Sequence, residues 1–216
     1  MKIFEIEVAH GERVTDTAVK NGTLDRTKFK SDNFRVIKDA ESKDGLYFCA
    51  AKIDGTRKNT NATEVPLLVF DIDDSPRSDV QITISMLKQK GLEFLLYTTA
   101  SYNPEKIDPI TNQFKYKCRL VMPLETPIKG SQYSEVMRYV ASEFKIKFDP
   151  AANKVSQPFF YPTVKESNKH HAKCVGQEGS AFVIDKDLLE TLKEDYSKKK
   201  TGHVAHRMPQ LPFVFK

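Results

Sequence analysis

The hydrophobic and polar positions of this chain alternate between periods typical of strands and of helices. Residues 2–8, KIFEIEV, alternate with a period of two, which predicts a half-buried strand. Residues 65–72, VPLLVFDI, form a continuous apolar run, so both faces of this strand are expected to be buried. Further strands are predicted over 45–53, 92–99, 114–124 and 158–164. Prolines bracket the last of these, which indicates an edge strand.

Three segments have the apolar spacing of a helix, and they are residues 77–90, 131–146 and 185–196. Ser75 and Pro76 offer an N-cap and a first-turn proline to the first helix, and Gly91 is expected to end it. Ser131 is the predicted N-cap of the second helix. Residues 9–44 are polar and give no clear period. The succession of strands and helices predicts a mixed α/β fold.

The length of 216 residues favours one substantial domain, which we expect over 1–196, followed by a basic tail over 197–216. After Tyr196 there is no acidic residue, whereas five lysines and arginines follow it. The formal net charge of +5 favours anionic partners but names none.

Cysteine usage and hydropathy predict a soluble cytoplasmic protein that is not bound to a membrane. Cys49, Cys118 and Cys174 are far apart and lack the close spacing of a zinc or redox motif, so they are expected to be reduced thiols. No apolar stretch approaches the roughly 20 residues that span a bilayer, and the N-terminus lacks the apolar core of a signal peptide.

The acidic end of the strand over 65–72 is the clearest candidate site. Asp71 and Asp73 are two residues apart on a strand, so their side chains project to the same side. Neighbouring buried carboxylates repel each other unless a cation lies between them. Mg²⁺ is usually held by one or two carboxylates together with substrate phosphates, so the pair suits phosphate chemistry. The alternative is that Asp73 and Asp74 cap the helix that follows.

Two known patterns compete for the run VFDIDD. Followed by Thr98 or Thr99 at the next strand end, it resembles the haloacid-dehalogenase-like phosphatases, which would make Asp71 a phosphorylated nucleophile. That family also carries a later hydrophobic-Gly-Asp run, and none follows residue 100 here.

The second pattern extends over about 45–165. In order, LLVFDID, TTASYNPE, CRLVMPLETPI and FKIKFDPAANK resemble the motifs of the archaeo-eukaryotic primase superfamily, particularly the primase-polymerase domains of phages and mobile elements. The resemblance implies an α/β (α+β) core with a central sheet related to the RNA-recognition type, preceded by a small N-terminal αβ part.

By this resemblance Asp71, Asp73 and Asp149 would be catalytic and would hold the metal ions, Mg²⁺ or Mn²⁺, that bridge a triphosphate and a primer hydroxyl. Taken alone, Asp149 could be an ordinary turn aspartate before Pro150.

Several cations are candidates for phosphate binding. Arg119 and Lys117 share one strand face with Lys115, and arginine binds phosphate with two donors. A solvated strand face is the alternative for the two lysines. Arg57 and Lys58 lie in the loop GTRKNTN, which resembles a loop of the same family.

The sequence departs from the family at Ser101-Tyr102. The family's histidine, which contacts nucleotide phosphates, aligns with Tyr102, and a tyrosine carries no positive charge. His170 and His171 could replace it only if the fold brings them near.

The resemblance implies template-directed nucleotidyl transfer that makes or extends primers in replication of a phage, plasmid or mobile element. The implied partners are a single-stranded DNA template, nucleoside triphosphates and a separate replicative helicase. The alternative is a replication initiator or single-stranded-DNA-binding protein that has lost turnover. For DNA contact, aromatic residues of 159–161 could stack on bases and the basic tail could follow the phosphate backbone.

Overall fold

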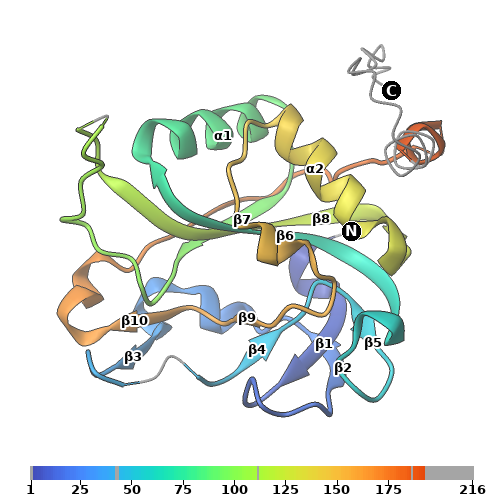
Figure 1. Cartoon of the computed structure of the whole chain (residues 1–216), viewed down its shortest axis with the longest axis horizontal. Coiled ribbons are helices and arrows are strands. Elements are labelled where there is room, and N and C mark those ends of the chain that lie inside the picture. The colour runs from blue at the N-terminus through green and yellow to red at the C-terminus, as the bar shows by residue number, and fades with distance from the viewer. Residues whose placement is uncertain (1, 42–43, 111, 186, 193–216) are drawn as a thin grey trace. The chain divides into compact units, whose positions relative to one another are not determined.

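The computed structural model describes residues 2–41, 44–110, 112–185 and 187–192 (Figure 1). Its strands are β1 (Glu7–Gly11), β2 (Lys20–Thr23), β3 (Arg35–Ile37), β4 (Tyr47–Phe48), β5 (Lys52–Ile53), β6 (Ala62–Pro76), β7 (Phe94–Thr98), β8 (Lys115–Ile128), β9 (Phe159–Phe160), β10 (Thr163–Lys165) and β11 (Cys174–Gln177). The labelled α-helices are α1 (Arg77–Gln89) and α2 (Tyr133–Glu143), and residues 187–192 are also helical. Seven short 3₁₀ helices are η1 (Ile3–Glu5), η2 (Arg26–Phe29), η3 (Ser31–Asn33), η4 (Asn59–Asn61), η5 (Gly130–Gln132), η6 (Pro150–Asn153) and η7 (Glu166–His171).

The chain divides into two compact units, Met1–Ile184 and Asp185–Lys216. The first unit contains a five-stranded antiparallel sheet in the order β11-β7-β8-β6-β5. Figure 1 shows α1 and α2 on one face of this sheet and the smaller strands on the other. Those smaller strands form a sheet in the order β2-β1-β4-β9 and a parallel pair, β3 with β10. The mixed α/β class predicted from the sequence is confirmed.

The core of the first unit is built around β6. All six residues from Val65 to Phe70 are buried, as their continuous apolar run predicts, because helices cover one face and the smaller sheet covers the other. The strand then continues past the apolar run to Pro76, where α1 begins.

Both predicted α-helices of this unit are confirmed, but their caps differ from the prediction. Ser75 is buried in β6, and Pro76 is the N-cap residue of α1 without a side-chain cap. Gly91, at φ 62°, follows α1 in the left-handed conformation that glycine favours. Ser131 lies in η5, and α2 begins at Tyr133.

The N-terminal part differs most from the prediction. Residues Ile3–Glu5 form η1, the backbone N–H of Ile3 donates to the Glu93 carboxylate at 3.0 Å, and β1 starts only at Glu7. The single strand predicted over 45–53 is two short strands in different sheets, β4 and β5. The edge strand predicted over 158–164 is likewise split into β9 and β10 at Pro162, which has no N–H to donate. The helical turns of this N-terminal part, η1, η2 and η3, are of the 3₁₀ type.

In the second unit, residues 187–192 are helical, within the helix predicted over 185–196. The carboxylate of Asp185 caps this helix by accepting the N–H of Leu188 at 2.7 Å. The predicted tail over 197–216 lies outside the described residues. Among the described helices, none has the length and apolarity needed to cross a bilayer.

Candidate active site

Asp71 lies directly opposite Arg119 where β6 pairs with β8. The Arg119 Nη2 donates to Asp71 Oδ2 at 3.0 Å. On the same strands, Lys117 Nζ lies 3.2 Å from Asp73 Oδ1. The structure therefore brings four of the predicted site residues together as two cross-strand ion pairs.

A β-bulge directs the acidic side chains at the end of β6. The register passes from Ile72 opposite Cys118 to Ser75 opposite Tyr116, so Asp73 and Asp74 both face a single residue, Lys117. Asp74 has φ 52°, a left-handed conformation that aspartate tolerates better than most residues.

Asp74 is held in the bulge by a lysine of the loop after β7. Lys106 Nζ donates to both carboxylate oxygens of Asp74, at 3.0 and 2.9 Å. The hydrogen bond from Lys106 lowers the pKa of Asp74. The charge of the bulge is thus already balanced by lysines.

Arg119 is enclosed between the five-stranded sheet and the segment that carries β9. Its residue surface is only 7% exposed, and its guanidinium lies 5.2 Å from the centre of the Phe159 ring. Nη1 donates to the Phe160 carbonyl at 3.0 Å, and Tyr97 lies beside it on β7 with its hydroxyl 3.4 Å away. Burial raises the pKa of Tyr97 to about 12, so the phenol stays neutral. In this arrangement Arg119 orients Asp71.

Asp149 lies beside Asp71 although the two are far apart in the sequence. The Asp149 N–H donates to the Asp71 carbonyl at 2.8 Å. The Asp149 carboxylate caps η6 by accepting the N–H of Ala151 at 2.9 Å. Asp149 is half-buried, and its carboxylate has oxygen acceptor capacity beyond this cap.

The donor chemistry of Asp71, Asp73 and Asp149 fits a hard divalent cation, because all three offer carboxylate oxygens. The positions of these three side chains fit a metal ion less well than their chemistry does. Within the described part of the chain, no three His, Cys, Asp or Glu side chains are grouped closely enough to hold a metal. A metal here would therefore depend on oxygen ligands from the substrate and would compete with Arg119 and Lys117 for the carboxylates.

Ser101 and Tyr102 lie in the turn after β7. Ser101 is exposed, whereas Tyr102 is buried with its ring 5.3 Å from that of Tyr116. Burial raises the pKa of Tyr102. The Tyr102 carbonyl accepts a hydrogen bond from Asn168 of η7, the helix that ends with exposed His170 and His171. The position of the family's histidine is thus occupied by a packing residue.

Arg57 and Lys58 are not brought to the acidic strand end. Their loop enters β6 at Ala62, the end of the strand remote from Asp71. Arg57 donates to the carbonyls of Val14 at 2.6 Å and Ser156 at 3.3 Å, so its guanidinium ties loops together. Lys58 is exposed in the same loop. The phosphate binding predicted for these two cations stays a prediction, and it would not take place at the acidic strand end.

Sequence reasoning missed Tyr97 and Lys106. Tyr97 belongs to an apolar run that predicts a buried strand. Its place beside Arg119 follows only from the register of β7 against β8. Lys106 lies in a long polar loop whose path has no periodic signal.

The chain belongs to the VapE N-terminal domain family, whose model matches residues 12–199. Among solved structures, the archaeo-eukaryotic primase domain of the cyanophage S-2L primase-polymerase is similar to this chain, with a TM-score of 0.46 and 10% sequence identity. The similarity covers 86% of this chain and 88% of that one. Among curated protein sequences, none matches this chain. A structural similarity of this size carries no conclusion about chemistry.

Proposed function

We propose that this domain is a metal-dependent nucleotidyltransferase that makes or extends primers on single-stranded DNA, in replication of a phage, plasmid or mobile element. The observation that supports this most is the backbone hydrogen bond between Asp149 and Asp71. It joins the two acidic motifs whose meeting the chemistry requires.

Asp71, Asp73 and Asp149 are the residues that would hold Mg²⁺ or Mn²⁺. When bound, such ions neutralise triphosphate charge and stabilise the attacking and leaving oxygens of an in-line displacement. Arg119 fixes the direction of the Asp71 carboxylate from its buried position. Lys117 and Lys106 balance the remaining acidic charge, and phosphate oxygens would compete with the aspartates for the exposed Lys106 and the half-buried Lys117.

Primer synthesis on single-stranded DNA tests this function. We expect a labelled product in the presence of Mn²⁺ or Mg²⁺, and its loss by at least about 100-fold in Asp71→Asn and in Asp73→Asn, because each removes charge that the transition state needs. Asp79→Asn is the matched control, since Asp79 is an acid of α1 paired with Lys147 at 2.8 Å. Equal product from wild type and the two site variants would contradict the proposal.

A second candidate is a single-stranded-DNA-binding replication factor without turnover. The packing of Tyr102 on Tyr116 favours it, because this position then supplies no cation for phosphates. In the same assay, metal-independent DNA binding with no product in either metal would select this candidate.

A further inference from the structure

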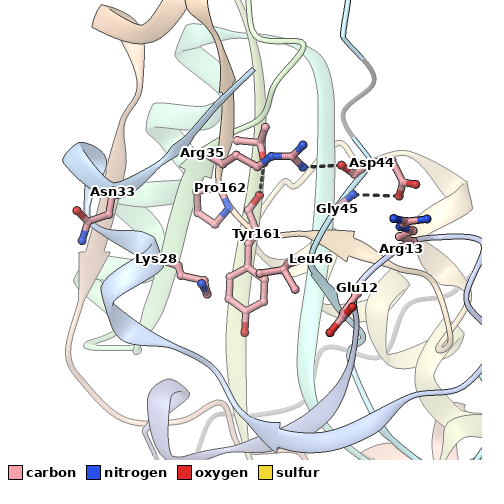
Figure 2. A pocket seen from close by; sticks show the side chains of 11 residues that line it. Glu12, Arg13, Lys28, Asn33, Arg35, Asp44, Gly45, Leu46, Tyr161 and Pro162 are labelled. Carbon is pink, nitrogen blue, oxygen red and sulfur yellow. Dashed lines mark hydrogen bonds between the residues drawn. The ribbon is translucent and has the colours of Figure 1, made fainter. Parts of the chain in front are cut away.

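A polar pocket of about 480 Å³ lies on the smaller-sheet side of the molecule, apart from the paired acids of β6 (Figure 2). Its lining comes from several short elements, including the chain after β1, η2, β3 and the connection between β9 and β10. Of the candidates named from the sequence, only Tyr161 lines it, because most of its lining belongs to the polar residues 9–44 and their neighbours.

Three cations surround this pocket. Figure 2 shows Arg13, Lys28 and Arg35 around Tyr161, each on a separate element. Arg13 and Arg35 are exposed, and Lys28 is half-buried with its Nζ 6.0 Å from the centre of the Tyr161 ring. Spread in this way, the cations suit successive phosphates of a chain better than the compact charge of one triphosphate.

Two acids also line the pocket. The Asp44 carboxylate accepts backbone N–H bonds from Val14 at 2.9 Å and Gly45 at 3.0 Å, so hydrogen bonds within the fold occupy it. Glu12 is exposed and free to point into solvent. Two further acids pair with the cations from outside the lining, Glu41 with Arg35 at 3.5 Å and Asp25 with Lys28 at 3.7 Å. These ion pairs are exposed and therefore weak, so phosphate groups can compete with the carboxylates for the cations.

The pocket also offers apolar surface and lies next to the candidate active site. Leu46, at 47% exposure, lines it beside Tyr161 and Pro162. Tyr161 and Thr163 line both this pocket and a small cavity that Arg119 and Tyr97 line from the other side. The pocket and the cavity beside Arg119 thus share two lining residues.

We propose that this pocket binds a segment of single-stranded nucleic acid, with Arg13, Lys28 and Arg35 contacting phosphates and the exposed Leu46 facing a base, while Tyr161 is buried and forms the floor of the pocket. Apolar side chains between cations are the usual means by which proteins hold single strands without sequence preference. The proposal rests on the function proposed above, since it assigns the path of the template strand.

The test is binding of a fluorescent oligothymidine by fluorescence anisotropy in EDTA, which removes any contribution from the acidic site. The full chain carries Arg13→Glu with Lys28→Glu, and the matched control carries Lys88→Glu, an exposed cation of α1 on the other face of the large sheet. We expect the double variant to bind roughly tenfold more weakly. The slope of log K against log salt concentration should also become smaller by the amount that corresponds to about two phosphate contacts. The control keeps the wild-type affinity.

Binding unchanged in the double variant, or no binding by wild type, would overturn the pocket assignment. Full displacement of the oligonucleotide by a single equivalent of nucleoside triphosphate would overturn it as well, by assigning the pocket to a nucleotide. Measuring Asp71→Asn in parallel separates the two proposals. If this variant binds DNA normally and wild type makes no primer, the pocket stands and the nucleotidyltransferase proposal fails.

Discussion

At the scale of single residues, Arg119 determines how the candidate active site is arranged. It is buried, yet its charge is matched by Asp71, by the Phe160 carbonyl and by two aromatic rings. Its Nε has no hydrogen-bond partner among the described residues. A buried arginine with an unpaired Nε is stable in the fold only while its other partners stay in place.

Replacing Arg119 is therefore expected to cost far more than replacing its neighbour Lys117. Arg119→Met should lower the free energy of unfolding by about 3 kcal/mol, because a buried pair is broken and Asp71 loses its partner. Lys117→Met should lower it by less than about 1 kcal/mol, because the Asp73 partner is well exposed. Urea unfolding of both variants measures the difference, and equal losses would contradict the structural role given to Arg119.

Alkaline pH should destabilise the domain through buried groups that must stay neutral. Burial raises the pKa of Tyr97 from 10.0 to about 12 and that of Cys49 from 9.0 to about 12. A raised folded-state pKa gives stability that is complete below the unfolded-state value and is lost as pH rises through the folded-state value.

The free energy of unfolding is thus expected to fall from about pH 9 upward, with the contribution of Tyr97 falling between about pH 10 and 12. Tyr97→Phe should be less stable at pH 8, since it loses the 2.9 Å hydrogen bond to Phe160, and should show a shallower decrease at high pH. Urea midpoints from pH 8 to 11 measure this. A stability that does not change over this range would refute the buried, neutral state of these groups.

At the scale of elements, the bulge of β6 brings the acidic side chains at the end of this strand together in the candidate active site. A regular strand would place Asp73 and Asp74 on opposite faces, whereas the bulge sets both against Lys117. The sequence gives no sign of it, because a bulge depends on how β6 and β8 align over their whole length.

The left-handed conformation of Asp74 provides a test of the bulge. Asp74→Val should lower the free energy of unfolding by about 1–2 kcal/mol more than Asp74→Asn, because a β-branched residue is strained at this φ. Asp74→Asn loses only an exposed ion pair with Lys106 and tolerates the conformation. Thermal or urea unfolding compares the two, and equal stability would mean that the bulge carries no such strain.

Elements with a strong period were predictable, and short ones were not. The apolar run of β6 and the helical spacing of α1 and α2 each bury a continuous face, so their sequences determine their type. The strands β4, β9 and β10 have two or three residues each and are defined by their partners in two separate sheets. Sequence patterns of that length cannot say where one sheet ends and another begins.

At the scale of the whole molecule, the candidate site depends on long-range contacts. The motif resemblance groups Asp71, Asp73 and Asp149, and the fold brings the Asp149 backbone to Asp71, but among the described residues the three carboxylates are not grouped closely enough to hold a metal by themselves. The resemblance also added Arg57, which the fold uses instead to tie the loops at Val14 and Ser156. A local motif carries no information about the path of the loop that contains it.

In the proposed function, three carboxylates that are distant in the sequence take a divalent ion together with a triphosphate. Mn²⁺ binding, followed by electron paramagnetic resonance with and without a non-hydrolysable nucleoside triphosphate, tests it most directly. We predict tight binding by wild type only when the nucleotide is present, clear weakening in Asp71→Asn, Asp73→Asn and Asp149→Asn, and no change in Asp79→Asn. Nucleotide-dependent Mn²⁺ binding that survives Asp149→Asn at the wild-type level would contradict the account.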